Sequence, residues 1–138
     1  MNQLIHIFFA GDFCSTSSTK PIMVSEELRS KIAECNLKVC NFEVPLKPDS
    51  MAVKPGCFFC QNDDAPAFLK NLGFNIFPFA NNHVFDYGDE GYRKTIAAFG
   101  GEMFGSGTYD EAYRVKVVEL GGKNRILGSL FCCTPWSV

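Results

Sequence analysis

The sequence predicts an α/β fold that begins as a parallel βαβαβ unit, and three apolar runs indicate the strands. The runs cover residues 4–10, 37–42 and 76–79. Each is short and rich in β-branched or aromatic residues, as buried strands are. Segments with helix start and stop signals separate the runs. Alternating strands and helices favour parallel neighbouring strands joined by right-handed crossovers.

Helix signals fill both gaps between these runs. Residues 25–33 begin with the capping residue Ser25, followed by acidic residues in the first turn, which is typical of a helix start. Residues 63–73 begin with an acidic pair, carry Pro66 in the first turn and end at Gly73, which together favour a second helix.

The last third of the sequence predicts one more helix and a β-hairpin. Residues 89–99 begin with acids and are followed by two glycines, which indicates a helix and its end. Residues 113–120 and 125–131 are strand-like and flank a Gly-Gly-Lys-Asn segment at 121–124. That arrangement predicts a hairpin with its turn at these four residues.

Polar side chains follow each of the three predicted parallel strands. Asp12 comes after the first, Glu43 after the second, and Asn81, Asn82 and His83 after the third. In an open α/β sheet, ligands bind beyond the carboxyl ends of the strands, where such side chains converge. We therefore expect these groups to meet at one edge of the sheet.

Two carboxylates, a carboxamide and an imidazole form a hard oxygen and nitrogen donor set, which suits Mn²⁺, Mg²⁺, Zn²⁺ or Fe²⁺. A metal ion in such a site polarises a phosphoryl oxygen and activates water, so metal-assisted hydrolysis is the natural chemistry. His83 is placed to act as a general acid, since imidazole exchanges protons near neutral pH. Asp86, three residues later, is expected to orient His83.

Each of these residues also has a purely structural interpretation. Asp12 fits a turn cap after glycine, and Asn81 and Asn82 fit left-handed turn positions. Glu43 fits a solvated strand end, and His83 fits a hydrogen-bonded loop residue. The order of all of them at successive strand ends favours a site.

The ordered motifs resemble the CapA-like family of poly-γ-glutamate capsule-synthesis proteins, whose domain is similar to the calcineurin-like metallophosphatases. The motifs are Gly11-Asp12, Asn41-Phe42-Glu43-Val44-Pro45, Gly73-Phe74-Asn75, Ala80-Asn81-Asn82-His83, Asp86-Tyr87-Gly88, Gly105-Ser106-Gly107 and Glu111-Ala112. The resemblance implies an α/β/β/α sandwich, of which this chain would form the parallel start and the hairpin.

The resemblance also implies roles for individual residues. Asp12 and Asn82 would be metal ligands, Glu43 would replace the bridging carboxylate of the phosphatases, and His83 would be the catalytic imidazole. Cys14 stands where the phosphatases usually have a histidine.

Three further residues are expected to contact an anionic small-molecule or polymer substrate. Asn41 and Asn81 belong to the same motifs, and Lys54 lies in the proline-containing loop 44–56 that overhangs the expected crevice. A solvated lysine is the alternative for Lys54.

Residues 1–138 are expected to form the N-terminal portion of a single CapA-like domain, truncated at its C-terminus, because the family contributes further histidines and none follows His83. The terminal hairpin would then have unpaired edges, so we expect the chain as given to self-associate. Because the further histidines of the family are absent from it, we also expect residues 1–138 alone to have no phosphoesterase activity.

Composition agrees with one ordinary α/β domain: 46% of residues are hydrophobic and 20% charged. A net charge of −2 argues against a nucleic-acid partner. Apolar runs fall short of the ~20 residues of a membrane span, and Met1-Asn2-Gln3 lacks the basic start of a signal peptide. The chain as written is therefore expected to be cytoplasmic, although relatives in the family are often membrane-anchored or exported.

Seven cysteines in an α/β sequence favour reduced thiols over a disulfide framework. The spacing of Cys57 and Cys60, with Cys35 and Cys40 as a second pair, leaves a structural zinc or redox site as the alternative.

Two functions remain open at this point. The first is a metal-dependent hydrolase acting on a phosphoester or related bond in capsule or poly-γ-glutamate metabolism. The second is a non-catalytic accessory or binding protein for capsule assembly.

Overall fold

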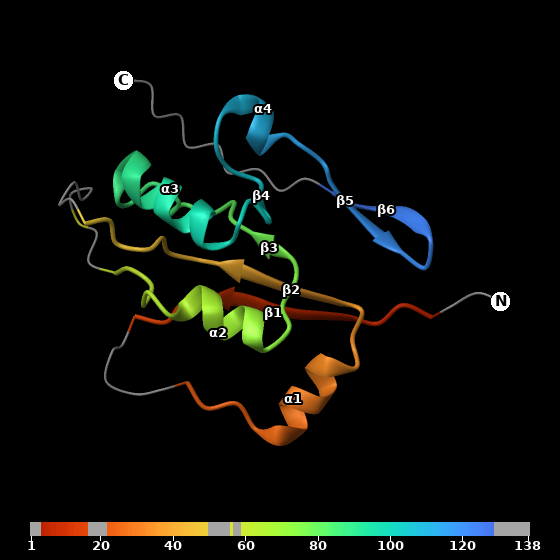
Figure 1. The fold of residues 1–138 in the computed structure, drawn as a ribbon. Helices are drawn as coiled ribbons and strands as arrows, with labels where there is room; N and C mark the ends of the chain where they lie inside the picture. Colours follow the sequence, from red (N-terminus) through yellow and green to blue (C-terminus); the bar gives the residue numbers. More distant parts are fainter. Residues whose placement is uncertain (1–3, 17–21, 50–55, 57–58, 129–138) are drawn as a thin grey trace.

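The computed structural model describes residues 4–16, 22–49, 56 and 59–128 of the chain (Figure 1). The elements in chain order are β1 (Ile7–Phe13), α1 (Glu26–Ala33), β2 (Leu37–Phe42), α2 (Ala65–Asn71), β3 (Phe77–Pro78), α3 (Gly88–Ala98), β4 (Met103–Phe104), α4 (Tyr109–Ala112), β5 (Lys116–Leu120) and β6 (Lys123–Gly128).

Four parallel strands follow one another in the order β1, β2, β3 and β4. β1 pairs with β2 and β3 pairs with β4, both in parallel. A parallel bridge between Val39 and Ile76 joins β2 to β3. The predicted α/β class with a parallel βαβαβ start is therefore confirmed.

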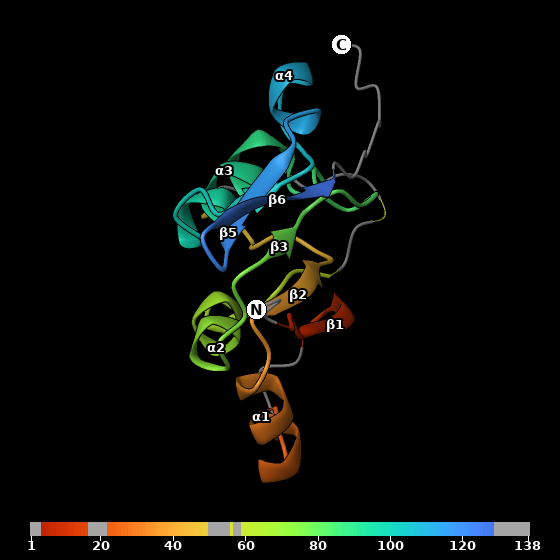
Figure 2. The same ribbon diagram turned by 90° about the vertical axis from the view of Figure 1, so that its right-hand side faces the viewer.

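The helices are unevenly distributed around these strands (Figure 2). α2 and α3 lie on one side of the strands, whereas α1 lies beyond β1. The antiparallel hairpin of β5 and β6 extends away from α1, on the side of β3 and β4.

Phenylalanine rings fill the core between the strands and α3. Phe42, Phe77, Phe79 and Phe99 are all fully buried. The ring centre of Phe99 lies 4.9 Å from that of Phe42 and 4.5 Å from that of Phe77. Such tilted and edge-on contacts are the favoured geometries for aromatic pairs. This cluster supports the ends of β2 and β3, where the candidate site lies.

The predicted end of the first strand was wrong. β1 continues past Gly11 to Phe13, and its pairing shifts register between Phe9, which faces Val39, and Asp12, which faces Asn41. Gly11 has a φ of 75°, a conformation open to glycine, and the shift is that of a β-bulge. Asp12 is therefore a strand residue and not a turn residue beyond the strand.

The helices match the prediction more closely than the short elements do. Ser25 caps α1 by accepting a hydrogen bond from the Leu28 backbone at 3.2 Å. Asp64 precedes α2 but makes no capping bond with its side chain, so the expected acidic cap does not form. Differences of one or two residues at the other helix ends are within the usual variation of helix boundaries.

The hairpin turn is shorter than the predicted four residues. Gly121 and Gly122 alone form it, with φ values of 59° and 70°. Two positive φ values are required by a type I′ turn, which matches the twist of the flanking strands. β6 therefore begins at Lys123, earlier than expected.

β4 and α4 were not predicted. β4 has two residues and α4 has four, which is too short for hydrophobic periodicity to reveal them. α4 begins with a capping box between Thr108 and Glu111.

Candidate functional site

The two expected carboxylate ligands meet through the side chain of Asn41. The Nδ2 atom of Asn41 donates to Oδ1 of Asp12 at 2.7 Å and to Oε2 of Glu43 at 2.6 Å. Asp12 and Asn41 are partners across the β1–β2 pair. Asn41 and Glu43 are two residues apart at the end of β2, so they point to the same face. The predicted convergence of Asp12 and Glu43 is thus present.

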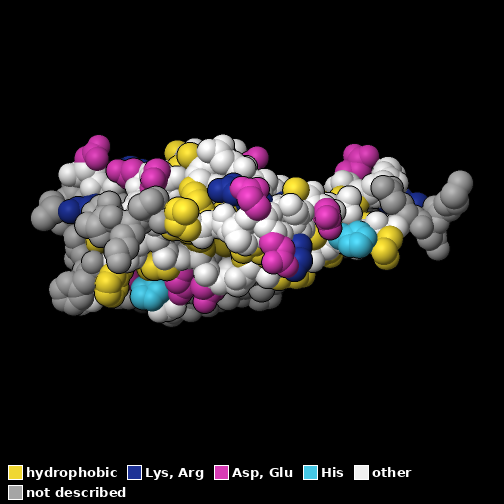
Figure 3. Space-filling view, turned by 90° about the horizontal axis from the view of Figure 1, so that it is seen from below, with side chains coloured by type: hydrophobic (Ala, Val, Ile, Leu, Met, Phe, Trp, Pro, Cys, Tyr) yellow, Lys and Arg dark blue, Asp and Glu magenta, His cyan; other side chains and the backbone are white. Residues whose placement is uncertain are grey.

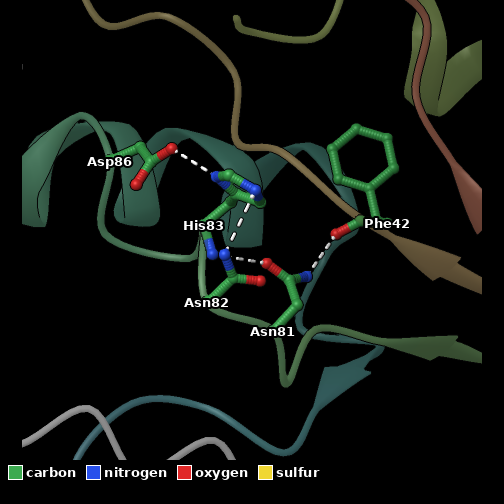
Figure 4. A network of polar contacts seen from close by, with 5 residues as sticks. All are labelled: Phe42, Asn81, Asn82, His83 and Asp86. Atoms are coloured by element: carbon green, nitrogen blue, oxygen red, sulfur yellow. Dashed lines mark hydrogen bonds and ion pairs between the residues drawn. The ribbon is translucent and has the colours of Figure 1, made fainter. Parts of the chain in front are cut away.

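His83 and Asp86 form a second group in the turns between β3 and α3 (Figure 4). Nδ1 of His83 lies 2.6 Å from Oδ2 of Asp86, and Nε2 lies 3.2 Å from Nδ2 of Asn82. The Asp86 side chain is only 4% exposed, whereas that of His83 is 38% exposed. A carboxylate at Nδ1 and an amide donor at Nε2 together favour the tautomer with its proton on Nδ1.

Asn81 connects the two groups. Its Nδ2 donates to the backbone oxygen of Phe42 at 3.0 Å, and its Oδ1 accepts from the backbone nitrogen of His83 at 3.0 Å (Figure 4). Phe42 lies between Asn41 and Glu43 in the sequence. The turn that carries His83 is therefore bonded to the strand end that carries the carboxylates.

The structure does not join Asn82 directly to the carboxylates. Among the described residues, Asn82 makes its side-chain hydrogen bond with His83 and none with Asp12 or Glu43. Lys54 lies outside the described residues. The left-handed interpretation of Asn81 and Asn82 was wrong, because every described residue with positive φ is a glycine.

Gln61 organises the end of β1 next to this site, which the sequence did not reveal. Its side chain donates to the Phe13 backbone oxygen at 2.7 Å and accepts from the Ser15 backbone nitrogen at 2.6 Å. Its own backbone nitrogen donates to Pro45 at 3.0 Å. The segment around Gln61 therefore bonds to the chain after both β1 and β2. No local pattern marks this glutamine, since its partners are distant in sequence.

The thiols near the carboxylates are held in the neutral form. The pKa of Cys14 is raised, first by desolvation of its sulfur and then by the charges of Glu43 and Cys60. Burial, and next the charge of Asp12, raises the pKa of Cys40 to about 12. The four described cysteines, Cys14, Cys35, Cys40 and Cys60, are free. Cys57, Cys132 and Cys133 lie outside the described residues, and the reduced state of the thiols stays a prediction.

α3 fixes the chain that follows Glu43. The buried hydroxyl of Thr95 accepts from the Leu46 backbone nitrogen at 2.9 Å and donates to the Gly91 oxygen at 2.7 Å. Nζ of Lys94 donates to the Lys47 oxygen at 2.8 Å. These contacts hold the chain against α3 three and four residues after Glu43.

The residues of this edge fit a divalent cation in their chemistry. Asp12 and Glu43 each have one oxygen bonded to Asn41, and each carboxylate has a second oxygen in addition. The described residues contain no cluster of three or more His, Cys, Asp and Glu side chains arranged to hold a metal. The expected ligand set has only two such carboxylates, and its third member, Asn82, is an amide. Carboxylate and amide oxygens are ligands that Mg²⁺ and Mn²⁺ accept.

Two carboxylates lie together at the ends of parallel strands. Next to them is an imidazole bonded to a buried carboxylate. This chain is therefore an α/β protein with a polar site at the carboxyl edge of its sheet. The chain belongs to the bacterial capsule synthesis protein family PGA_cap, whose family model matches residues 6–133. The match includes every candidate site residue. Comparison with curated proteins gave no match. Within the described residues, none of the helices has both the length and the apolar character needed to cross a membrane.

Proposed function

We propose that this chain carries the metal-binding edge of a hydrolase that acts on a phosphoester or related bond in capsule or poly-γ-glutamate metabolism. The proposal rests on one observation: the strand end with the pair of carboxylates is hydrogen-bonded to the turn that carries the imidazole. Asp12 and Glu43 share one amide donor, and Asn81 ties them to the turn of His83. Membership of a capsule synthesis family supports the biological setting.

In this proposal Asp12, Glu43 and Asn82 hold one divalent ion, with Mn²⁺, Zn²⁺, Mg²⁺ and Fe²⁺ as the candidates. Such an ion, when bound, polarises the phosphoryl oxygen and lowers the pKa of bound water. Asn82 makes its present bond with His83, so ligation would require its amide to rotate toward the carboxylates.

His83 protonates the leaving group in this scheme. Asp86 holds Nδ1, so once the Asn82 amide has rotated away and Nε2 carries a proton, Nε2 is the atom that gives this proton to the leaving group and regains one from water. The partly exposed ring is accessible to a substrate, while the buried Asp86 carboxylate stabilises the protonated imidazole. Asp86 therefore acts through His83 and not on the substrate itself.

Metal content of two variants tests the ligand assignment. Asp12→Ala and Glu43→Ala should each lose bound Mn²⁺ or Zn²⁺ by elemental analysis, because each removes a charge and a bond, while circular dichroism stays unchanged. Asp89→Ala is the matched control, since this carboxylate is exposed and pairs with Arg93 on α3. Unchanged metal stoichiometry in both test variants would overturn the proposal.

A turnover assay separates the hydrolase from an accessory protein. Hydrolysis of a generic phosphodiester to a phosphomonoester and an alcohol in the presence of Mn²⁺, abolished in Asp12→Ala, supports the hydrolase. Binding of poly-γ-glutamate with no turnover contradicts it and supports the accessory role.

A further inference from the structure

We propose that Asn41 is a positioning residue that pins one oxygen of each carboxylate and thereby leaves Asp12 Oδ2 and Glu43 Oε1 for the cation. The inference rests on the proposed function, because it takes these carboxylates as the metal ligands. It assigns to Asn41 a role other than the substrate contact expected from sequence.

The geometry of the amide carries this assignment. A carboxamide nitrogen has two N–H bonds, and Asn41 directs them to two different carboxylates, at 2.7 and 2.6 Å. Both distances are shorter than the ~2.9 Å typical of N–H···O bonds, as expected when the acceptor is charged. No donor of the amide is left for a substrate.

The environment of the amide oxygen of Asn41 shows what fixes the orientation of this amide. Oδ1 of Asn41 is buried and has no hydrogen-bond partner among the described residues. A buried acceptor without a partner is unfavourable. Exchanging Oδ1 and Nδ2 would place an acceptor between two carboxylates and lose two charge-assisted bonds. The carboxylates therefore determine which way the amide points.

Electrostatics explains why such a residue is needed. Two carboxylates within bonding distance of one nitrogen repel each other. The shared donor offsets this repulsion and holds the pair together before any cation arrives. Ligand side chains that are already in place bind a cation more tightly, because they lose less conformational entropy when it binds. Asn41 thus acts on metal affinity without being a ligand.

The test measures Mn²⁺ binding by isothermal titration calorimetry in Asn41→Ala, Asn41→Leu and Asn41→Gln. Affinity should fall 10- to 100-fold in Asn41→Ala and Asn41→Leu, the range seen when the partners of metal ligands are removed. Asn41→Gln keeps both donors on a longer side chain, so it should retain more affinity than the other two. Wild-type affinity in whichever of Asn41→Ala and Asn41→Leu folds would overturn the inference.

Asn75 provides the matched control, because its amide also bridges neighbouring segments but, within the part of the chain that the structure describes, makes no hydrogen bond with a carboxylate. It accepts from the Lys38 backbone at 2.9 Å and donates to the Asn36 oxygen at 3.2 Å, at the opposite end of β2. Asn75→Ala should lower the Tm of the metal-free protein without changing Mn²⁺ affinity. A purely structural role for Asn41 would make the two alanine variants behave alike in both measurements, which would contradict the proposal.

The two proposals fail in different ways. If Asp12→Ala and Glu43→Ala keep their metal, the proposed function is wrong. If those variants lose the metal and Asn41→Ala binds Mn²⁺ as the wild type does, only the positioning role of Asn41 is wrong.

Discussion

Asp86 and His83 are joined twice within a single turn of the chain. Oδ2 of Asp86 lies 2.6 Å from Nδ1 of His83, and the Asp86 backbone nitrogen donates to the His83 oxygen at 2.9 Å. The side-chain contact and the turn that makes it possible therefore support each other. A ring held in this way has its Nε2 aimed by the backbone as well as by the carboxylate.

Replacing His83 should reduce turnover more than replacing Asp86. His83→Gln should lower kcat by ~10²–10⁴, the usual loss when a general acid is removed. Asp86→Asn should lower it by about 10- to 100-fold, because the ring keeps its place in the chain but loses the carboxylate that orients it and stabilises its protonated form. Steady-state kinetics on a phosphodiester measures both, with Asp89→Asn as the control. Loss of bound metal in His83→Gln would show that His83 is a ligand and not the acid.

The buried hydroxyl of Thr95 should contribute to stability through the Leu46 backbone. Thr95→Val keeps the shape of the side chain but leaves the Leu46 N–H without its acceptor, a loss of about 1–3 kcal/mol in the free energy of unfolding. Thr95→Ser retains the hydroxyl and should lose less. Urea denaturation followed by fluorescence measures the difference. Equal stabilities of the valine and serine variants would contradict the role of this hydrogen bond.

Cys40 should resist alkylation in the folded protein. Burial, with the charge of Asp12, raises its pKa from 9.0 to about 12, and the neutral thiol is a poor nucleophile. Iodoacetamide at pH 8 should label Cys35, which is partly exposed, well before Cys40. Peptide mass spectrometry gives both rates, and equal rates would refute the prediction.

The same pKa shift sets the direction of a pH effect on stability. The folded state keeps the Cys40 proton to higher pH than the unfolded state does. The contribution of the protonated Cys40 thiol to the free energy of unfolding is therefore complete below pH 9.0, and it is lost as the pH rises towards about 12. Cys40→Ala should show a smaller loss of stability over this interval than the wild type.

Residues 1–138 should self-associate through exposed apolar side chains beside β1. Phe9 is 70% exposed and Met23 is 87% exposed, and both line an apolar groove of about 400 Å³ between β1, α1 and α2. Apolar side chains reach the surface at several places on the face drawn in Figure 3. Contiguous exposed apolar surface favours association.

Light scattering after size-exclusion chromatography tests this prediction. Phe9→Thr should shift the mass towards that of the monomer, whereas Phe59→Thr, an exposed phenylalanine that does not line this groove, should not. A monomeric wild-type chain would contradict the prediction.

The sequence predicted the fold class and the longer elements because their signals are local. Caps, acidic first turns and apolar runs marked α1, α3 and β2 to within a few residues. The extension of β1 was missed because it depends on a bulge at Gly11, which forms only against β2. β4 has two residues and depends on its pairing with β3, which no local pattern reveals.

The candidate site was predictable to a similar extent. Strand ends identified Asp12, Glu43 and the turn of His83 without knowledge of contacts. The bonds from Asn41 to Asp12 and from Gln61 to Phe13 were not predictable, because they join residues 29 and 48 positions apart.

The bond between Asp12 and Asn41 joins residues 29 positions apart and exists only while β1 and β2 are paired. A cation that needs both carboxylates is consequently a ligand of the native state alone. By mass action, a free cation concentration one hundred times the Kd would stabilise the folded chain by ~2.7 kcal/mol. The supply of metal would then govern how long the protein survives unfolding and proteolysis, in addition to governing turnover.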